Sequence, residues 1–320
     1  MLSEDFRLKV VFMGTPEFSV LVLAALLDAG HDVVGVYSQP DRPAGRGGRV
    51  AAPPVKGYAV ERGLPTFQPR SLRRDDGARL ELASLAPDLI VVAAYGLILP
   101  ADTLDLPRLG SLNIHPSLLP RYRGPSPVAA AILDGEPVTG VTVMKLDETM
   151  DTGPIVAQRP TPIGADETAE ELTSRLFQMG AALLIEELPQ WASGELQAVP
   201  QDGSLATVTS RLSRQDGEID WGRPAELISR QVRAYHPWPG SFTHWKGARL
   251  KVIEALEADA GSDISASPGE VVLLDEGGLG VGTGSGVLQV RRVQLEGGAV
   301  TTSAQFVQGH RELVGSILGS

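Results

Sequence analysis

Two polar side chains in residues 111–124, SLNIHPSLLPRYRG, and an acidic turn at residues 147–153 are the strongest candidates for chemistry. Asn113 and His115 are two residues apart, so at the end of a strand both side chains point to the same face of a sheet. Asp151 lies in the acidic turn, between two further expected strands. An amide, an imidazole and a carboxylate at strand ends of one sheet suit acyl transfer to an amine without a covalent intermediate. The amide and the imidazolium would hydrogen-bond the oxygen that becomes negative, while the carboxylate orients the imidazole and favours its charged form.

Simpler interpretations of these residues stay open at this point. An isolated Asn-x-His is as often a histidine that caps a loop, and turns favour Asp and Gly by themselves. Cysteine is absent, which excludes disulfides, thiolate zinc sites, iron–sulfur clusters and a cysteine nucleophile. The other histidines outside the Pro-rich 235–240 segment, His31, His244 and His310, have no companions at ligand spacing, so we expect no metal.

Two glycine-containing segments lack the pattern of a nucleotide site. Residues 14–18 follow an expected strand but contain one glycine, which argues against an NAD or FAD site at this turn. Residues 277–286 are glycine-rich but have no P-loop lysine, and they are more typical of hairpin turns.

Alternating strand and helix signals in the first half predict the sheet that positions these groups. Repeated strand–helix–strand units imply right-handed crossovers and a Rossmann-like, mostly parallel sheet in an α/β domain. Ligands in such folds bind outside the carboxyl ends of the strands. The expected strands are residues 8–13, 33–37, 88–94, 111–114, 138–144 and 155–159, and the expected helices are residues 18–29, 55–62, 78–85 and 169–191.

The second half has a different pattern. Residues 194–210 are rich in Gly, Pro, Gln, Ser and Thr without periodicity, which indicates a linker. After a helix at 225–235, short alternating segments punctuated by glycine predict a small C-terminal β-barrel of the OB-like type. A length of 320 residues agrees with two domains.

The chain resembles the methionyl-tRNA formyltransferases, a family of folate-dependent formyltransferases, over nearly its whole length. The segments that carry the resemblance are FMGTPEFSV, QPDRPAGRG, VVAAYGLILP, NIHPSLLPRYRG, MDTG and HPWPG. It implies a catalytic, folate-binding formyltransferase domain at 1–193, a linker at 194–210 and an OB-like tRNA-binding domain at 211–320.

The resemblance also implies the site. Asn113, His115 and Asp151 would be catalytic, the donor would be 10-formyl-tetrahydrofolate, and the acceptor would be the α-amine of methionine on initiator tRNA. Two apolar turns would hold the pteridine of the donor. These are Ser117, Leu118, Leu119 and Pro120, and Leu97, Ile98 and Leu99.

The loop at residues 39–54 and the second domain are the features that separate this family from its relatives. The loop carries Arg42, Arg46 and Arg49, whose planar forks suit phosphates and base edges. The resemblance implies that they contact the tRNA acceptor stem. Gly48 and Arg49 stand where the family often has paired lysines, and Pro116 is the form found in glycinamide ribonucleotide formyltransferase.

Charge and composition bound the partners. A net charge of −11 argues by itself against a polyanion, but residues 41–74 hold eight basic and two acidic residues, and residues 207–255 have a weaker basic excess. A small, localised tRNA footprint is therefore expected. The N-terminus has no signal-peptide pattern, the longest apolar run is interrupted, and no long apolar seam is evident, so we expect a cytoplasmic monomer that does not span a membrane.

Two alternatives remain at the level of the sequence. One is a formyltransferase that acts on a small amine, glycinamide ribonucleotide or an amino sugar nucleotide, with the barrel used only for dimerisation. The other is a nucleic-acid-binding module with a degenerate catalytic domain, which the joint presence of Asn113, His115 and Asp151 disfavours.

Overall fold

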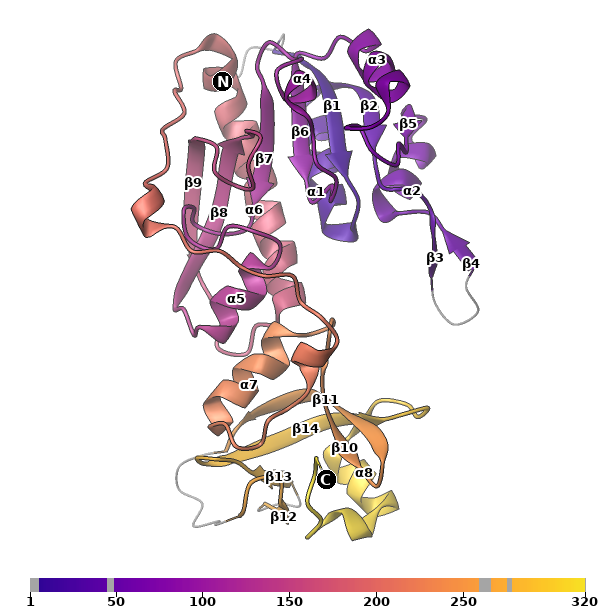
Figure 1. The fold of residues 1–320 in the computed structure, drawn as a ribbon, viewed down its shortest axis with the longest axis vertical. Helices are drawn as coiled ribbons and strands as arrows, with labels where there is room; N and C mark the ends of the chain where they lie inside the picture. The colour runs from indigo at the N-terminus through magenta and orange to yellow at the C-terminus, as the bar shows by residue number, and fades with distance from the viewer. Residues whose placement is uncertain (1–5, 45–48, 259–265, 275–277, 320) are drawn as a thin grey trace. The chain divides into compact units, whose positions relative to one another are not determined.

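The computed structural model describes residues 6–44, 49–258, 266–274 and 278–319 (Figure 1). Contacts divide the chain into two compact units. The first consists of Met1–Pro127, Val138–Pro162 and Thr173–Thr209, and the second of Val128–Pro137, Ile163–Leu172 and Ser210–Ser320.

The first unit is built on one seven-stranded sheet. Its strand order is β5-β2-β1-β6-β7-β8-β9, with parallel pairing from β5 to β7 and antiparallel pairing from β7 to β9. β1 and β6 are continuous apolar runs because helices cover both faces of the sheet. The strand bounds are β5 (Thr66–Phe67), β2 (Asp32–Tyr37), β1 (Lys9–Gly14), β6 (Leu89–Ala93), β7 (Ser111–His115), β8 (Val138–Lys145) and β9 (Ile155–Pro162).

Alternate residues of the strands supply two separate cores. Val10 and Phe12 of β1 face one cluster with α1, α2 and α6, while Val11 and Met13 face another with α3 and α4. An added Cβ on Gly180 of α6 would lie 2.5 Å from Ile114 Cγ2, so this glycine lets α6 approach β7 closely. The helix bounds are α1 (Glu17–Asp28), α2 (Pro54–Glu61), α3 (Asp76–Ser84), α4 (Ala101–Leu104), α5 (Pro127–Leu133) and α6 (Ala169–Ser193).

The second unit contains an antiparallel sheet that curls into a half-barrel. Its order is β10-β11-β14-β13-β12, and β15 pairs with β14. Register shifts on both sides of Glu254 bend β11, as bulges do, and α7 packs its apolar face into the core. The bounds are α7 (Ala225–Ala234), β10 (Ser241–Trp245), β11 (Ala248–Glu257), β12 (Val271–Leu273), β13 (Leu279–Gly282), β14 (Val287–Leu295), β15 (Thr301–Thr302) and α8 (Ser303–Gly309).

The predicted fold class is confirmed, with a mostly parallel α/β sheet followed by an antiparallel half-barrel. The expectation of a plain loop at 39–54 is wrong, because β3 (Arg42–Ala44) and β4 (Arg49–Ala51) pair as a short two-stranded hairpin. The helices α4, α5 and α8 were not predicted from the sequence.

The segment predicted as a linker, residues 194–210, lies along the first unit up to Thr209. Val199 pairs with Ile155, and Val208 forms a bridge with Arg123. The prediction that one domain ends at residue 193 and the next begins at residue 211 stays a prediction. Within the described part of the chain, no helix is both long enough and apolar enough to cross a membrane.

Candidate active site

Most of the groups expected to form the site lie at the carboxyl ends of β6 and β7, and Asp151 lies in the loop after β8. β2 and β6 flank β1 on opposite sides, so the strand order reverses there, the position where open α/β sheets bind ligands. Thr15, just after β1, donates its hydroxyl to the Tyr95 carbonyl at 3.0 Å, and Gln39 after β2 donates its amide to the same carbonyl at 3.1 Å. These contacts fix the end of the sheet next to β7.

His115, the last residue of β7, is buried, and its two ring nitrogens face different protein groups. Nε2 lies 2.9 Å from the Tyr122 carbonyl oxygen. Because a carbonyl can only accept, Nε2 donates, and the neutral ring keeps its lone pair on Nδ1. Nδ1 lies 3.7 Å from Asp151 Oδ1. The ring and the carboxylate therefore form a pair with room for one added proton between them.

Burial lowers the pKa of His115 below its usual 6.5. The Asp151 carboxylate and the Tyr122 carbonyl act in the opposite direction, as the sequence predicted for Asp151, but desolvation is the larger effect. The lowered pKa favours the neutral imidazole near neutral pH, whereas the sequence predicted that the charged form would hydrogen-bond the developing negative oxygen. The sequence could not show that His115 is only 4% exposed.

Asp151 is held in a backbone conformation that few non-glycine residues adopt, with φ of 55°. Its Oδ2 accepts a hydrogen bond of 2.8 Å from the Gly124 backbone N–H. A Cβ on Gly153 would lie 1.9 Å from the Lys145 carbonyl oxygen, so this position in the MDTG motif admits only glycine. The tight turn directs the Asp151 carboxylate toward His115.

Asn113 is half-buried two residues before His115 on β7. Its side chain makes no hydrogen bond to any other residue that the structure describes. Since buried and half-buried amides in proteins usually find partners, an unbonded amide at this strand end is free to donate to a ligand oxygen.

The turn at Ser117, Leu118, Leu119 and Pro120 follows β7 directly and is anchored by the antiparallel strands. Thr142 of β8 donates its hydroxyl to the Ser117 carbonyl at 2.6 Å and accepts from the Leu119 N–H at 3.2 Å. Gln158 of β9 donates to the Leu119 carbonyl and to the Thr142 hydroxyl, both at 2.8 Å. The Ser117 carbonyl and both backbone groups of Leu119 are therefore bonded to the antiparallel strands.

The second predicted folate turn follows β6, the parallel neighbour of β7. Leu97 is half-buried, Ile98 is 69% exposed and Leu99 is buried in the core. The turn therefore anchors itself through Leu99 and presents Ile98 at the same edge of the sheet as Asn113.

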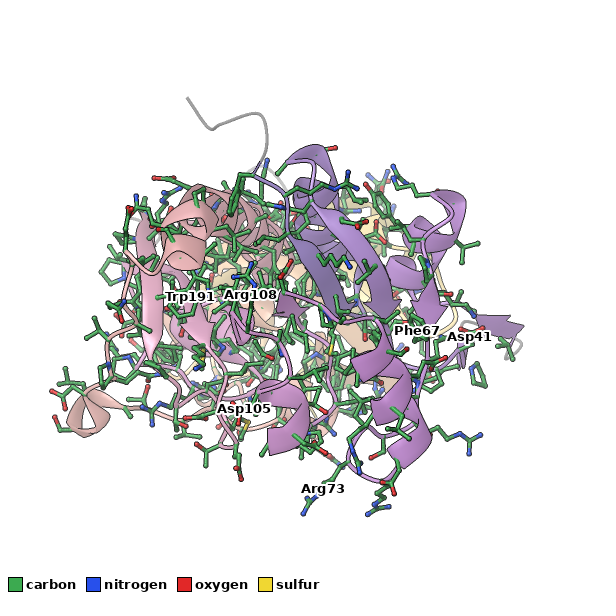
Figure 2. The ribbon with its side chains drawn as sticks, turned by 90° about the horizontal axis from the view of Figure 1, so that it is seen from above. Asp41, Phe67, Arg73, Asp105, Arg108 and Trp191 are labelled. Atoms are coloured by element: carbon green, nitrogen blue, oxygen red, sulfur yellow. The ribbon has the colours of Figure 1, made fainter. Side chains whose placement is uncertain are left out.

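The hairpin after β2 is attached to the sheet by one ion-pair cluster. The Asp41 carboxylate accepts from Lys56 at 2.8 and 2.9 Å and from Gln68 at 2.7 Å, and Figure 2 labels Asp41 beside Phe67, the residue before Gln68. These bonds lower the pKa of Asp41. Arg42 is exposed and has no ion-pair partner among the described residues.

Arg46 lies outside the described residues, and the structure describes the backbone of Arg49, in β4, but not its side chain. Because Lys56 and Gln68 occupy Asp41, the single acidic residue in the hairpin's sequence does not neutralise Arg42.

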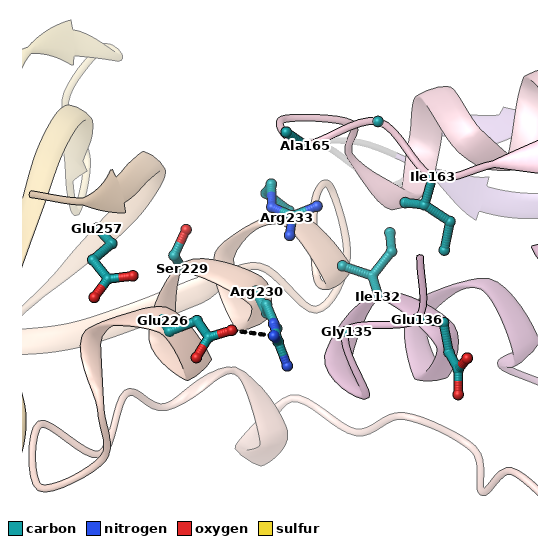
Figure 3. A pocket seen from close by; sticks show the side chains of 11 residues that line it. Ile132, Gly135, Glu136, Ile163, Ala165, Glu226, Ser229, Arg230, Arg233 and Glu257 are labelled. Atoms are coloured by element: carbon teal, nitrogen blue, oxygen red, sulfur yellow. Dashed lines mark hydrogen bonds and ion pairs between the residues drawn. The ribbon is translucent and has the colours of Figure 1, made fainter. Parts of the chain in front are cut away.

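Two cavities lie away from these groups. One, of about 280 Å³ in the second unit, is lined by more acidic than basic side chains, and Arg230 in it already pairs with Glu226 (Figure 3). The other, of about 360 Å³ in the first unit, lies at the amino end of β7, and its lining includes Arg108 and Trp191, which Figure 2 labels. Neither contains a predicted site residue. Among the described residues, no three acidic or histidine side chains gather as a metal site would need.

Several residues that shape the site were missed from the sequence: Tyr122, Thr142, Gln158 and Gln201. They are ordinary polar residues in strands or irregular segments. The one available signal was indirect, since Tyr122 lies in the same conspicuous 111–124 segment as His115.

Two family models match the chain. The model described as formyl transferase matches residues 8–188, and the model described as formyl transferase, C-terminal domain, matches residues 211–311.

Curated relatives match along nearly the whole length. The chain is 50% identical over 314 residues to the methionyl-tRNA formyltransferase of Roseiflexus castenholzii, covering 98% of this chain and 99% of that one. It is 42% identical over 307 residues to the methionyl-tRNA formyltransferase of Marinobacter nauticus, covering 96% and 98%.

Solved structures share the fold at lower identity. HypX from Aquifex aeolicus in complex with tetrahydrofolic acid matches with a TM-score of 0.65 at 19% identity, over 96% of this chain and 48% of that one. The sugar 3N-formyltransferase WlaRD matches with a TM-score of 0.65 at 18% identity, over 91% and 98%. At these identities the likeness concerns the fold alone.

Proposed function

Because the chain belongs to the methionyl-tRNA formyltransferase family, we propose that it transfers the formyl group of 10-formyl-tetrahydrofolate to the α-amine of methionine on initiator tRNA. The product is formylmethionyl-tRNA for translation initiation. We place the reaction in the cytoplasm, where translation takes place, and propose that the chain acts as a monomer.

The observation that carries the proposal is a buried imidazole paired with a carboxylate beside an unbonded amide at one strand end. Asn113 donates its free amide hydrogens to the formyl oxygen as the methionyl nitrogen attacks the formyl carbon. This role needs a donor that no protein group already occupies.

The His115–Asp151 pair moves the proton. His115 Nδ1 takes a proton from the attacking nitrogen, and the resulting imidazolium is stabilised by Asp151 at 3.7 Å and by its Nε2–H bond to Tyr122. The same proton then passes to N10 of the folate as the bond between the formyl carbon and N10 breaks. The His115–Asp151 pair returns to its starting state. The formyl group has moved from N10 to the methionyl nitrogen, and a proton has moved from the methionyl nitrogen to N10.

The donor and the acceptor use separate surfaces. We propose that the two anchored turns after β6 and β7 hold the folate, since an apolar face with fixed backbone partners suits a flat heterocycle. Arg42, Arg46 and Arg49 of the hairpin bind the tRNA acceptor stem through its phosphates.

One assay with separate acceptors tests this function. The protein is mixed with 10-formyl-tetrahydrofolate and offered initiator Met-tRNA, elongator Met-tRNA, glycinamide ribonucleotide or an amino sugar nucleotide. We expect rapid formylation of initiator Met-tRNA alone. Turnover of a small amine without turnover of Met-tRNA would replace the proposal, and tRNA binding without any formyl transfer would reject an enzymatic function.

A further inference from the structure

One side chain from the segment predicted as a linker, residues 194–210, is hydrogen-bonded to the loop at residues 147–153 that carries Asp151. Gln201 donates its amide N–H groups to the carbonyl oxygens of Asp151, at 2.9 Å, and Gly153, at 2.7 Å. Its amide oxygen accepts from Arg123 Nε at 3.1 Å and Nη2 at 2.7 Å.

The Gln201 amide thus makes all four hydrogen bonds that it can make. A flipped amide would place its oxygen against two carbonyl oxygens and its N–H groups against a guanidinium, so only one orientation is allowed. A glutamate of the same shape keeps the contact with Arg123 but cannot donate to Asp151 or Gly153.

Arg123 joins this grip to the rest of the site. On one side Tyr122 accepts the hydrogen bond from His115 Nε2, and on the other side Gly124 donates to the Asp151 carboxylate. Three consecutive residues therefore hold the ring, the carboxylate and, through Gln201, the backbone of the loop that carries the carboxylate.

We propose that Gln201, locked by Arg123, is a positioning residue that holds Asp151 at its working distance from His115. It touches no reacting atom. Asp151 sits in a strained backbone conformation and faces His115 across 3.7 Å, so it depends on its surroundings to stay there. The inference rests on the proposed function, because the effect on turnover is read in formyl transfer.

The test compares two isosteric changes on the same segment. Gln201→Glu removes both donors to the loop, while Gln197→Glu makes the same change at an exposed side chain that donates only to the Gly194 carbonyl. We expect Gln201→Glu to lower kcat roughly 10- to 100-fold, with KM for folate and for tRNA unchanged, since a small misplacement of a reacting group has this effect. Gln197→Glu should match the wild type.

A double variant distinguishes positioning from general damage. In the Asp151→Asn background there is no carboxylate left to position, so adding Gln201→Glu should reduce kcat further by less than about threefold. The inference is overturned if Gln201→Glu lowers kcat as much in the Asp151→Asn background as it does in the wild type. It is also overturned if the Gln201→Glu single variant has wild-type kcat. If Gln201→Glu does not fold, Arg123→Met takes its place, and wild-type kcat in that variant overturns the inference as well.

Hydrogen exchange tests the hydrogen bonds from Gln201 to the loop without any need for turnover. Amides of residues 147–153 should exchange faster in Gln201→Glu than in Gln197→Glu and the wild type. Equal exchange in all three would contradict the inference even if the protein proves to formylate a different acceptor.

Discussion

At the scale of single residues, His115 has fixed partners before any substrate binds. The Tyr122 carbonyl sets which nitrogen of the neutral ring carries the proton, and burial lowers the pKa of the ring. Asp151 opposes that effect of burial without overcoming it. The balance provides a base that is ready to accept a proton near neutral pH.

The pH dependence of kcat/KM follows from this balance. The pKa of His115 is lowered from 6.5, so the neutral form persists as the pH falls below 6.5, and activity should decline only at lower pH as the ring becomes protonated. Asp151→Asn removes the charge that raises this pKa, so the acid limb should move to lower pH, while kcat falls about 10²- to 10⁴-fold. A pH–rate profile of both proteins checks this, and an acid limb at or above 6.5 in the wild type would contradict it.

At the scale of elements, the antiparallel strands β8 and β9 act as an anchor for the turn after β7. Thr142 is fully buried and supplies both a donor and an acceptor to that turn. The strand register that opposes His115 to Thr142 brings this hydroxyl to the correct position.

Thr142→Val keeps the shape of the side chain and removes these hydrogen bonds. It leaves the Ser117 carbonyl and the Leu119 N–H without this partner, so we expect a loss of about 1–3 kcal/mol in the free energy of unfolding and a raised KM for the folate donor. Denaturant unfolding and steady-state kinetics measure the two effects. Thr139→Val on the same strand is the control, and equal effects from both changes would show that the turn does not depend on Thr142.

The hairpin has its own anchor in Asp41, Lys56 and Gln68. Lys56→Met releases the Asp41 carboxylate, which becomes free to approach Arg42, so KM for tRNA should rise a few-fold while kcat and KM for folate stay near wild type. Lys56→Arg should restore most of the affinity, and Lys9→Met, at an exposed lysine of β1, should have no effect. A fall in kcat with unchanged KM for tRNA would argue against this role.

The elements that position the site were largely predictable from the sequence, whereas the contacts between them were not. Strong two-residue alternation places Asn113 and His115 at the end of β7, and continuous apolar runs identify β1 and β6. The grip of Gln201 on Asp151 spans 50 residues of sequence and has no local pattern, because a hydrogen bond between a side chain and a distant backbone leaves no periodicity.

At the scale of the whole molecule, an acidic protein with a net charge of −11 must present tRNA with a local excess of positive charge. Arg42 is exposed and unpaired among the described residues, and the nearest acidic side chain in the hairpin's sequence is already occupied. Repulsion between the tRNA phosphates and the excess of acidic residues elsewhere in the chain should restrict binding to a few phosphates.

Salt dependence measures the size of this footprint. If Arg42, Arg46 and Arg49 make the phosphate contacts, log K for tRNA should fall against log salt with a slope of about −3, and Arg42→Ala should make it shallower by about one. Fluorescence anisotropy over a potassium chloride series gives both slopes. A slope near −8 in the wild type would indicate a broad basic interface instead.

The order in which the residues around Gln201 are synthesised has a consequence for how the active site forms. The Tyr122 N–H donates to the Thr207 hydroxyl, and Arg123 bonds to both Gln201 and Thr209. Gln201, Thr207 and Thr209 leave the ribosome long after Asp151. At roughly 5–20 residues per second, several seconds of synthesis separate the catalytic carboxylate from the residues that hold it. A nascent chain therefore has strands β1 to β9 of the first unit synthesised while the active site is still incomplete, and it gains catalytic geometry only when translation has passed Thr209.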